Sequence, residues 1–590
     1  MNYKSLGATR RLLAFSIAML VPLFGFAQET APAPATTAAP EEEEVVELSP
    51  FEVTDEGDVG YMAATTLAGN RLNTNLRDIG NAVQVVTEEF LRDTGAVSND
   101  TLLQYTTNTE VGSVNGNFAG VGDGAILNET AKFKNPNQNT RVRGLAAADN
   151  ARDYYLSNVP WDAYNVDRVD LQRGPNSIMF GHGSPAGIIN TTTKQAGFQS
   201  GGNVQIRFDN YGSIRGSLDY NLALIEDELA VRVAGVSDNQ DFKQDPAYQD
   251  ALRGFGAVRW EPGFLKKGSA RTTIKANVEV GEIKSNRPRQ ITPIDLITPW
   301  FANGTYEGKD RNGNPFTYSE LNRQGFNPHA ANDDNYGRPG HGATRPAING
   351  GPDAGQPNPD YNPRVGSFAQ SFGGPLIYFN GMPGAGDTWT QEIREVRGIG
   401  PDGEIDTGLG FNFNRPVGIT TASSWAKNAG IEFAEIYKNY NISDPTVFDF
   451  YNNLLDGDNK EEWANFTTYS ASLGQTFMND KFGFELSYYG ESYDDGQLSL
   501  ITDSRQAIYI DINEVYADGT NAGTGTYPNN KPFADGTPNP NYGRPFISDS
   551  GQFGNNSYDS DRYTARATLF YTLDFEENGD GSTWRNILGK

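Results

Sequence analysis

Eight segments after Gly201 alternate between apolar and polar residues, and this alternation constrains the fold more than any other feature of the chain. In the clearest segment, Leu218 and Tyr220 alternate with Asp219 and Asn221. A period of two residues is that of a β-strand with one apolar and one polar face. The segments are Asn203–Phe208, Ile214–Leu222, Leu229–Val233, Leu252–Trp260, Arg271–Glu282, Phe466–Phe477, Phe482–Tyr493 and Arg562–Phe575.

Such strands form either a membrane barrel around a polar lumen or a soluble antiparallel sheet. The connections favour the barrel, because short turns alternate with longer links that reach residues 283–462 and 494–561. Short turns on one side and long loops on the other are typical of outer-membrane barrels. Soluble domains seldom contain loops of this length. The 66 Gly, 28 Tyr and 33 Phe suit the turns and the interfacial aromatic residues of a barrel.

The N-terminus predicts export. Arg10 and Arg11 precede an apolar run, Leu12–Phe26, which we interpret as part of a signal peptide over residues 1–27. A membrane anchor is the alternative, but the run is shorter than the ~20 residues that a spanning helix needs. No later stretch approaches that length, so a membrane-embedded mature protein must cross the bilayer with strands closed into a barrel.

Composition excludes several classes of function. The chain has no cysteine, which removes disulfides, thiolate catalysis and cysteine-ligated metals. A formal net charge of −27 argues against binding to nucleic acid. The Gly181–Ser184 turn, Gly-His-Gly-Ser, lacks the partners of an activated nucleophile. The acidic turns Asp402–Asp406 and Asp456–Asn459 lack complete calcium-loop spacing, so we interpret them as solvated turns. We predict no enzymatic activity and no cofactor.

The stretch Arg141–Lys194 has a different rhythm, in which short extended runs are separated by Gly, Pro and Asn. The runs predict strands at Asp153–Leu156, Val166–Leu171 and Gly187–Thr192. The crowded glycines imply unusual backbone dihedrals or a close approach to another surface. Upstream, Asn81–Val86 predicts a strand, Thr87 is expected to cap a short helix, and Ser98 or Asn99 a second one that ends by Gln104.

This pattern resembles the plug domain of TonB-dependent outer-membrane receptors. In that family an Arg-Gly pair is followed by a strand ending in Arg-Gly-Pro, a Gly-rich segment and an Ile-Asn strand ending in Thr-Lys. The matching residues are Arg141, Arg143, Gly144, Arg173, Gly174, Pro175, Gly181, Gly187, Asn190 and Lys194. One departure is Ser157-Asn158, where the family usually has Asp-Gly. We expect a turn there, because Asn tolerates left-handed backbone.

The resemblance implies the fold class, an antiparallel membrane β-barrel with an N-terminal α/β plug domain. About 22 strands are expected in the full-length protein, of which about eight are present. We expect the plug over residues 60–201 and the N-terminal portion of the barrel over 202–590, with the loops 283–462 and 494–561 extracellular. The chain stops in mid-pattern without a terminal aromatic residue, so we expect the C-terminal part of the barrel to be missing.

Residues 28–59 are predicted to be a disordered acidic tether, since Ala, Pro, Thr and Glu dominate its first part. In the resembled family a short segment of this tether, the TonB box, adds a strand to an energising periplasmic partner. The candidate TonB box is Val45, Val46, Glu47, Leu48 and Ser49. The alternative is that these residues form the first strand of the plug.

The resemblance implies a protein of the bacterial cell outer membrane that imports a scarce ligand through a plug-gated barrel. The ligand would be an iron-siderophore, another metal chelate, cobalamin or an oligosaccharide. The implied partners are a TonB-type energising protein, outer-membrane lipid and this ligand, with no nucleic acid. Arg141, Arg143 and Arg173 are predicted to pair with barrel carboxylates. A non-transporting adhesin or polymer-binding barrel is the alternative function.

Overall fold

The computed structural model describes part of the chain. The described residues are 51, 58, 60–68, 71–112, 140–174, 184–289, 292–298, 417–438, 441–445, 447–499, 507–510, 543–548 and 555–572, with shorter pieces between 305 and 394. Several predictions lie outside these residues. They concern the signal peptide 1–27, the TonB-box candidate Val45–Ser49, the motif residues Pro175 and Gly181, and the acidic turn 402–406.

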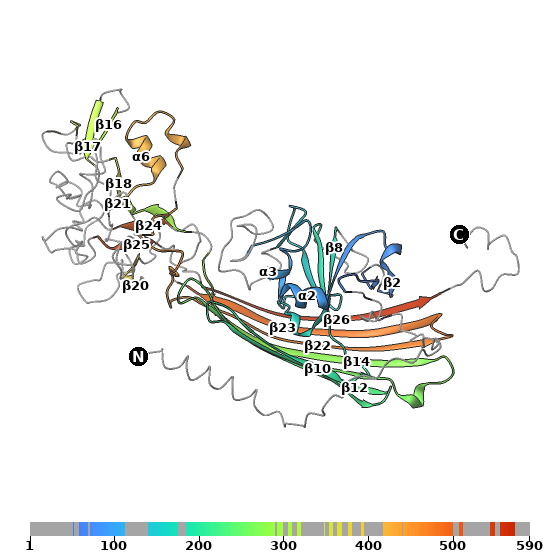
Figure 1. The fold of residues 1–590 in the computed structure, drawn as a ribbon. Coiled ribbons are helices and arrows are strands. Elements are labelled where there is room, and N and C mark those ends of the chain that lie inside the picture. The colour runs from blue at the N-terminus through green and yellow to red at the C-terminus, as the bar shows by residue number, and fades with distance from the viewer. Residues whose placement is uncertain are drawn as a thin grey trace, which may run out of the picture.

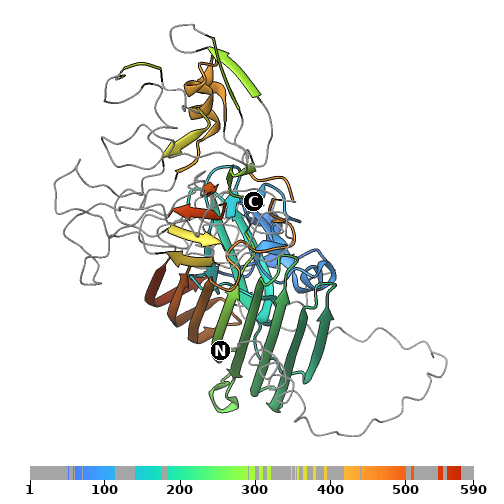
Figure 2. The same ribbon diagram turned by 90° about the vertical axis from the view of Figure 1, so that its left-hand side faces the viewer.

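All eight alternating segments form strands of one antiparallel sheet, ordered β10-β11-β12-β13-β14-β22-β23-β26 (Figure 2). The strands are β10 Gly201–Phe208, β11 Ile214–Ile225, β12 Leu229–Asp241, β13 Tyr248–Trp260, β14 Arg271–Asn286, β22 Glu461–Phe477, β23 Phe482–Leu498 and β26 Asn556–Tyr571. Several extend further toward the long connections than the alternation predicts. The sheet is curved, and the plug lies on its concave side (Figure 1).

The two faces of this sheet differ as the alternation predicts. On β11, Leu218 and Tyr220 are 42% and 48% exposed on the outer face, whereas Asp219 between them is 4% exposed beneath the plug. The outer face of the other strands continues the apolar surface with residues such as Val204 and Val280. In the described part of the chain, no helix is long and apolar enough to cross a membrane.

The plug is built on a five-stranded mixed sheet, ordered β3-β8-β9-β6-β7. Its strands are β3 Ala82–Thr87, β8 Val166–Arg173, β9 Gly187–Thr193, β6 Asp149–Arg152 and β7 Tyr155–Leu156. Helix α2, Glu88–Thr94, begins as predicted at Thr87, whose hydroxyl accepts a hydrogen bond from the Phe90 N–H at 3.3 Å. Helix α3, Asn99–Leu102, ends earlier than predicted. A buried apolar cluster that includes Leu91, Leu102 and Val169 forms the core.

The turn predicted at Ser157-Asn158 lies elsewhere. Left-handed backbone occurs at Asp153 and Tyr154, with φ of 48° and 62°, and joins β6 to β7 as a tight hairpin. The expected strand at 153–156 is therefore a turn followed by the two residues of β7. The turn is stabilised from the neighbouring strand, because the Tyr154 N–H donates to the Asn190 side chain at 2.7 Å.

The two long outer connections fold together into a second five-stranded sheet, ordered β15-β24-β25-β19-β20 (left of Figure 1). Strands β15 Ile294–Leu296, β19 Leu376–Phe379 and β20 Gln391–Arg394 follow β14, whereas β24 Ala507–Ile510 and β25 Pro545–Ser548 follow β23. At the base of these connections, Arg289 forms an ion pair with buried Asp456. The prediction that 456–459 is a solvated turn is therefore wrong at Asp456.

Candidate functional site

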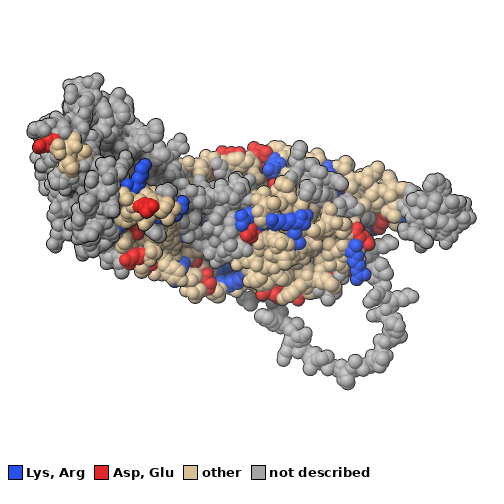
Figure 3. Space-filling view, turned by 90° about the horizontal axis from the view of Figure 1, so that it is seen from above, with Lys and Arg blue, Asp and Glu red and all other residues tan. Residues whose placement is uncertain are grey.

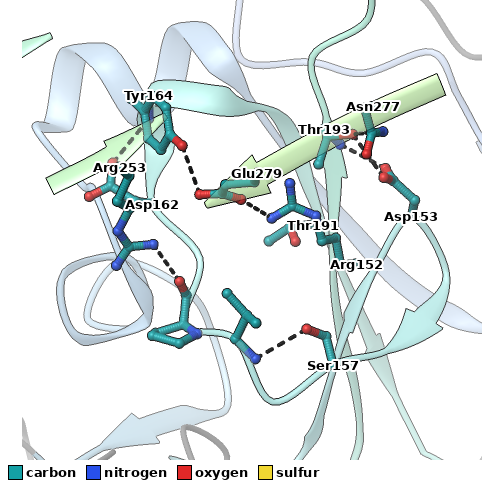
Figure 4. Close-up of polar contacts among 12 residues, drawn as sticks. Arg152, Asp153, Ser157, Asp162, Tyr164, Thr191, Thr193, Arg253, Asn277 and Glu279 are labelled. Atoms are coloured by element: carbon teal, nitrogen blue, oxygen red, sulfur yellow. Dashed lines mark hydrogen bonds and ion pairs between the residues drawn. The ribbon is translucent and has the colours of Figure 1, made fainter. Parts of the chain in front are cut away.

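The described contacts between plug and barrel are centred on a few buried carboxylates, and Glu279 of β14 joins two plug segments. Its carboxylate forms an ion pair with Arg152 of β6 and accepts a hydrogen bond from the Tyr164 hydroxyl at 2.8 Å (Figure 4). The side chains of Arg152 and Glu279 are only 5% and 1% exposed. Removing either partner would leave the other charge buried without compensation, which is costly.

Glu491 of β23 binds the plug segment that departs from the family pattern. Its carboxylate accepts hydrogen bonds from the Ser157 hydroxyl at 2.5 Å, the Asn158 N–H at 2.9 Å and the Tyr489 hydroxyl at 2.6 Å. Tyr489 also stacks on the plug residue Tyr155, with ring centroids 5.0 Å apart and planes inclined by 5°. The Ser-Asn pair therefore supplies donors to a barrel carboxylate.

Lys194, the last residue of the predicted motif, links the plug to β11. Its buried ammonium lies 2.9 Å from the Asp219 carboxylate of the barrel and 2.8 Å from Glu88 of the plug. Asp219 is bound in turn by Arg232 of β12 at 2.6 Å. The two cations share the barrel carboxylate, so this contact is a small network.

A fourth contact joins Asp162 of the plug to Arg215 of β11. Two hydrogen bonds of 2.5 and 3.0 Å join the carboxylate and the guanidinium, and Arg215 also pairs with Asp238 at 2.8 Å. Burial alone would raise the pKa of Asp162, but Arg215 and Arg253 outweigh it, so the pKa lies below its usual value. Asp162 is therefore ionised in the folded protein at neutral pH.

Apolar contacts between plug and barrel are fewer among the described residues. Val159 packs in a barrel cluster that includes Phe466 and Tyr493, and the Tyr164 ring packs against Phe255. Figure 3 shows acidic and basic residues interspersed on the described surface seen from above, so opposite charges are also neighbours outside the interface. Buried ion pairs add little net stability compared with apolar packing of similar volume. An interface composed mainly of buried ion pairs fixes the position of the plug in the barrel more than it stabilises their association.

The arginines predicted to pair with barrel carboxylates have other partners. Arg141 forms an ion pair with Glu110 of the plug, and Arg173 donates hydrogen bonds to Gln84 and Thr107 of the plug. The prediction is therefore wrong for these two residues. Figure 4 shows that Arg152 is the arginine that reaches a barrel glutamate. Arg143 contributes a backbone turn, with φ of 56°.

Other motif residues shape the plug backbone. Gly144, Gly174 and Gly187 all have positive φ. At Gly187 an added Cβ would lie 1.9 Å from the carbonyl oxygen of Gln172, so no other residue fits without a backbone shift. The side chain of Asn190, fully buried, holds the hairpin turn described above. These residues are structural parts of the plug.

A cavity of about 290 Å³ lies between plug and sheet near the long-loop ends of β10 to β14. Besides Trp161 of the plug, its lining includes four arginines and four aspartates, which are Arg207, Arg215, Arg253, Arg287, Asp100, Asp162, Asp209 and Asp238. The formal charges of this lining balance, and the Trp161 ring and the guanidinium groups can contact an aromatic ligand.

The sequence indicated the barrel side of these contacts but not the plug side. Arg215 and Asp219 stand at the polar positions of an alternating strand, and Glu279 at those of another, so their lumenal position follows from the period. Nothing in the sequence marks Arg152 or Asp162 as their partners, because pairing across domains depends on tertiary structure.

Comparison with known proteins agrees with this architecture. Residues 75–188 match the family model described as TonB-dependent Receptor Plug Domain. The ferrioxamine receptor of Yersinia enterocolitica is 25% identical over 257 residues, which are 43% of this chain and 33% of that receptor. The metal-pseudopaline receptor CntO of Pseudomonas aeruginosa (strain PAO1) is 27% identical over 222 residues, 37% of this chain and 29% of the relative. The chain thus matches about a third of the length of these relatives.

Among solved structures, the pyoverdine outer membrane receptor FpvA from Pseudomonas aeruginosa PAO1 bound to pyoverdine aligns with a TM-score of 0.37 and 13% identity. That alignment covers 77% of this chain and 52% of the receptor. The family match and the curated relatives confirm the resemblance expected from the sequence. Residues 75–188 are a plug domain of the TonB-dependent receptor type, and the chain is similar to receptors of that family.

Proposed function

We propose that the full-length protein is an active-transport receptor that binds a metal chelate of the siderophore type at its outer face and imports it through the barrel. The observation that carries this proposal is the plug, which is seated on the lumenal face of the barrel sheet through a few polar contacts such as Arg152–Glu279. A gate must be held in one position and still be able to separate, and polar contacts with small net stability satisfy both requirements.

The relatives support the choice of ligand class. Their names identify one as a receptor for ferrioxamine and another as a receptor for metal-pseudopaline. Among the described residues, no group of three or more His, Asp or Glu side chains could hold a bare metal ion. The metal is cargo carried by its chelator.

Energy for import comes in this proposal from a periplasmic TonB-type protein that pairs with Val45–Ser49 by strand addition. Deleting these five residues from the full-length receptor should abolish uptake of a radiolabelled ferric siderophore while binding to whole cells persists. A panel of hydroxamate, catecholate and carboxylate ferric siderophores, with cobalamin and maltodextrin as controls, identifies the ligand. Uptake that continues after the deletion contradicts energised import. Binding without uptake in the intact receptor supports an adhesin instead.

A further inference from the structure

An aromatic residue of the N-terminal arm is buried against the barrel wall. Phe51 is 8% exposed, and its ring meets that of Phe570 on β26 edge to face, with centroids 5.2 Å apart and planes inclined by 74°. Phe570 lies on the lumenal face of the sheet and is also 8% exposed. This contact joins the arm to the barrel, whereas the plug contacts described above begin only further along the chain.

The barrel provides a niche for these two rings through glycines. The Cβ position of Gly474 on β22 lies 4.0 Å from the Phe51 ring, and a Cβ on Gly483 of β23 would lie 2.6 Å from the Phe570 ring. A side chain at Gly483 would therefore displace Phe570. Both glycines lie close to the short turn between β22 and β23, so the niche is near the rim opposite the long outer loops.

The order of contacts along the chain determines where a pulling force on the arm would act first. Phe51 follows the TonB-box candidate by two residues. The next described contact is Asp58, which pairs with Arg168 of the plug at 3.1 Å. Along the described residues, a pull on Val45–Ser49 therefore meets the barrel contact at Phe51 before the plug contact at Asp58.

We propose that Phe51 is a latch that anchors the energised arm to the barrel wall and must leave the Phe570 niche before force reaches the plug. This inference rests on the proposed function. Phe51 also lines a cavity of about 110 Å³ between plug and wall, together with Tyr155, Glu485 and Arg566. Removing the ring enlarges that space next to Tyr155, so the latch and the plug contacts are neighbours. Attraction in the niche is apolar, so it should weaken as the side chain at position 51 becomes smaller.

The first test measures how often the arm detaches at rest. These 590 residues contain no cysteine, so Ser49→Cys introduces a single thiol whose maleimide labelling reports exposure of the arm. Phe51→Ala should raise the labelling rate by about tenfold, because a buried ring is truncated, and Phe51→Leu should raise it less. Phe570→Ala should have a similar effect, and adding it to Phe51→Ala should change little further.

The control variant is Phe90→Ala, which removes a ring that packs against Tyr61 and Tyr105 within the plug. It should leave the labelling rate of Ser49→Cys unchanged. Equal rates in Phe51→Ala and the parent protein would overturn the latch. So would an equal increase in Phe90→Ala, because it would show general loosening of the plug.

The second test holds the latch closed. Cysteines introduced together at Phe51 and Gly474 can be joined by a short bis-thiosulfonate cross-linker that a reductant cleaves, since the Phe51 ring lies 4.0 Å from the Gly474 Cβ position. The cross-linked receptor should bind the ferric siderophore but not import it, and reduction should restore import. Each single-cysteine variant should transport before and after treatment with the reagent. Import by the fully cross-linked pair would overturn the latch. If deletion of 45–49 leaves uptake intact, the proposed function fails, whereas the labelling result still decides whether Phe51 anchors the arm.

Discussion

The two faces of the barrel sheet are made from the same strands and meet opposite demands. On β11, Leu218 and Tyr220 form part of a lipid-facing surface, and Arg215 and Asp219 face the plug. The outer face depends on apolar side chains, which any similar side chain can replace. The lumenal face depends on particular pairs, each of which needs both partners. Tolerance to substitution should therefore alternate residue by residue along one strand.

The largest effect is expected on the lumenal face. Glu279→Ala should lower the free energy of unfolding of the plug by about 3–5 kcal/mol, because Arg152 is left buried without its partner. Urea denaturation of the receptor in detergent measures this loss. The double variant Arg152→Met with Glu279→Leu should recover most of it, since apolar replacement of both partners is nearly neutral. A double variant as unstable as Glu279→Ala would show that the charges themselves are required.

A charge on the outer face should be nearly as damaging. Leu218→Arg should cost about 2–4 kcal/mol in a bilayer, where the guanidinium faces hydrocarbon. Leu218→Ile is the matched control and should stay close to the parent protein. Folding into lipid vesicles, followed by electrophoretic mobility at increasing urea, gives both values. If Leu218→Arg folds as well as the control, this position does not face lipid.

The Asp162–Arg215 contact predicts a pH dependence. The pKa of Asp162 is lowered, so its stabilisation is present above the ordinary value of 3.8 and is lost as the pH falls through the lowered pKa. Plug stability should therefore decline below about pH 4, and less steeply in Asp162→Asn. Thermal unfolding between pH 3 and pH 7 compares the two proteins. Identical slopes would mean that other carboxylates account for the acid sensitivity.

The smallest effect is expected at the outward end of β14, beyond the apolar surface. Lys284 pairs with Glu282 at 2.5 Å, but both side chains are about half exposed. Exposed pairs of this kind contribute at most about 1 kcal/mol. Lys284→Ala should therefore leave the unfolding midpoint almost unchanged in the same urea titration. A loss comparable to that of Glu279→Ala would remove the distinction between buried and exposed pairs.

The sequence predicted the elements whose pattern is local. Alternation identified all eight barrel strands, and the cap at Thr87 identified helix α2. The hairpin turn at Asp153-Tyr154 was missed, because neither residue is glycine and the stabilising Asn190 is distant in sequence. The predicted partners of Arg141 and Arg173 were also wrong, because the charge of an arginine does not indicate which acceptor it contacts in the folded protein. Strands β15 and β24 are three and four residues long, too short for a readable period.

The shared outer sheet has a consequence for exchanging parts between related receptors. The two strands of the second connection, β24 and β25, lie between β15 and β19 of the first, and Tyr378 of the first packs on Phe546 of the second, with both rings fully buried. If either connection were transplanted alone, these aromatic rings would be exposed to water and the edges of their strands would be left unpaired. The two connections should therefore be exchanged together, as a single unit.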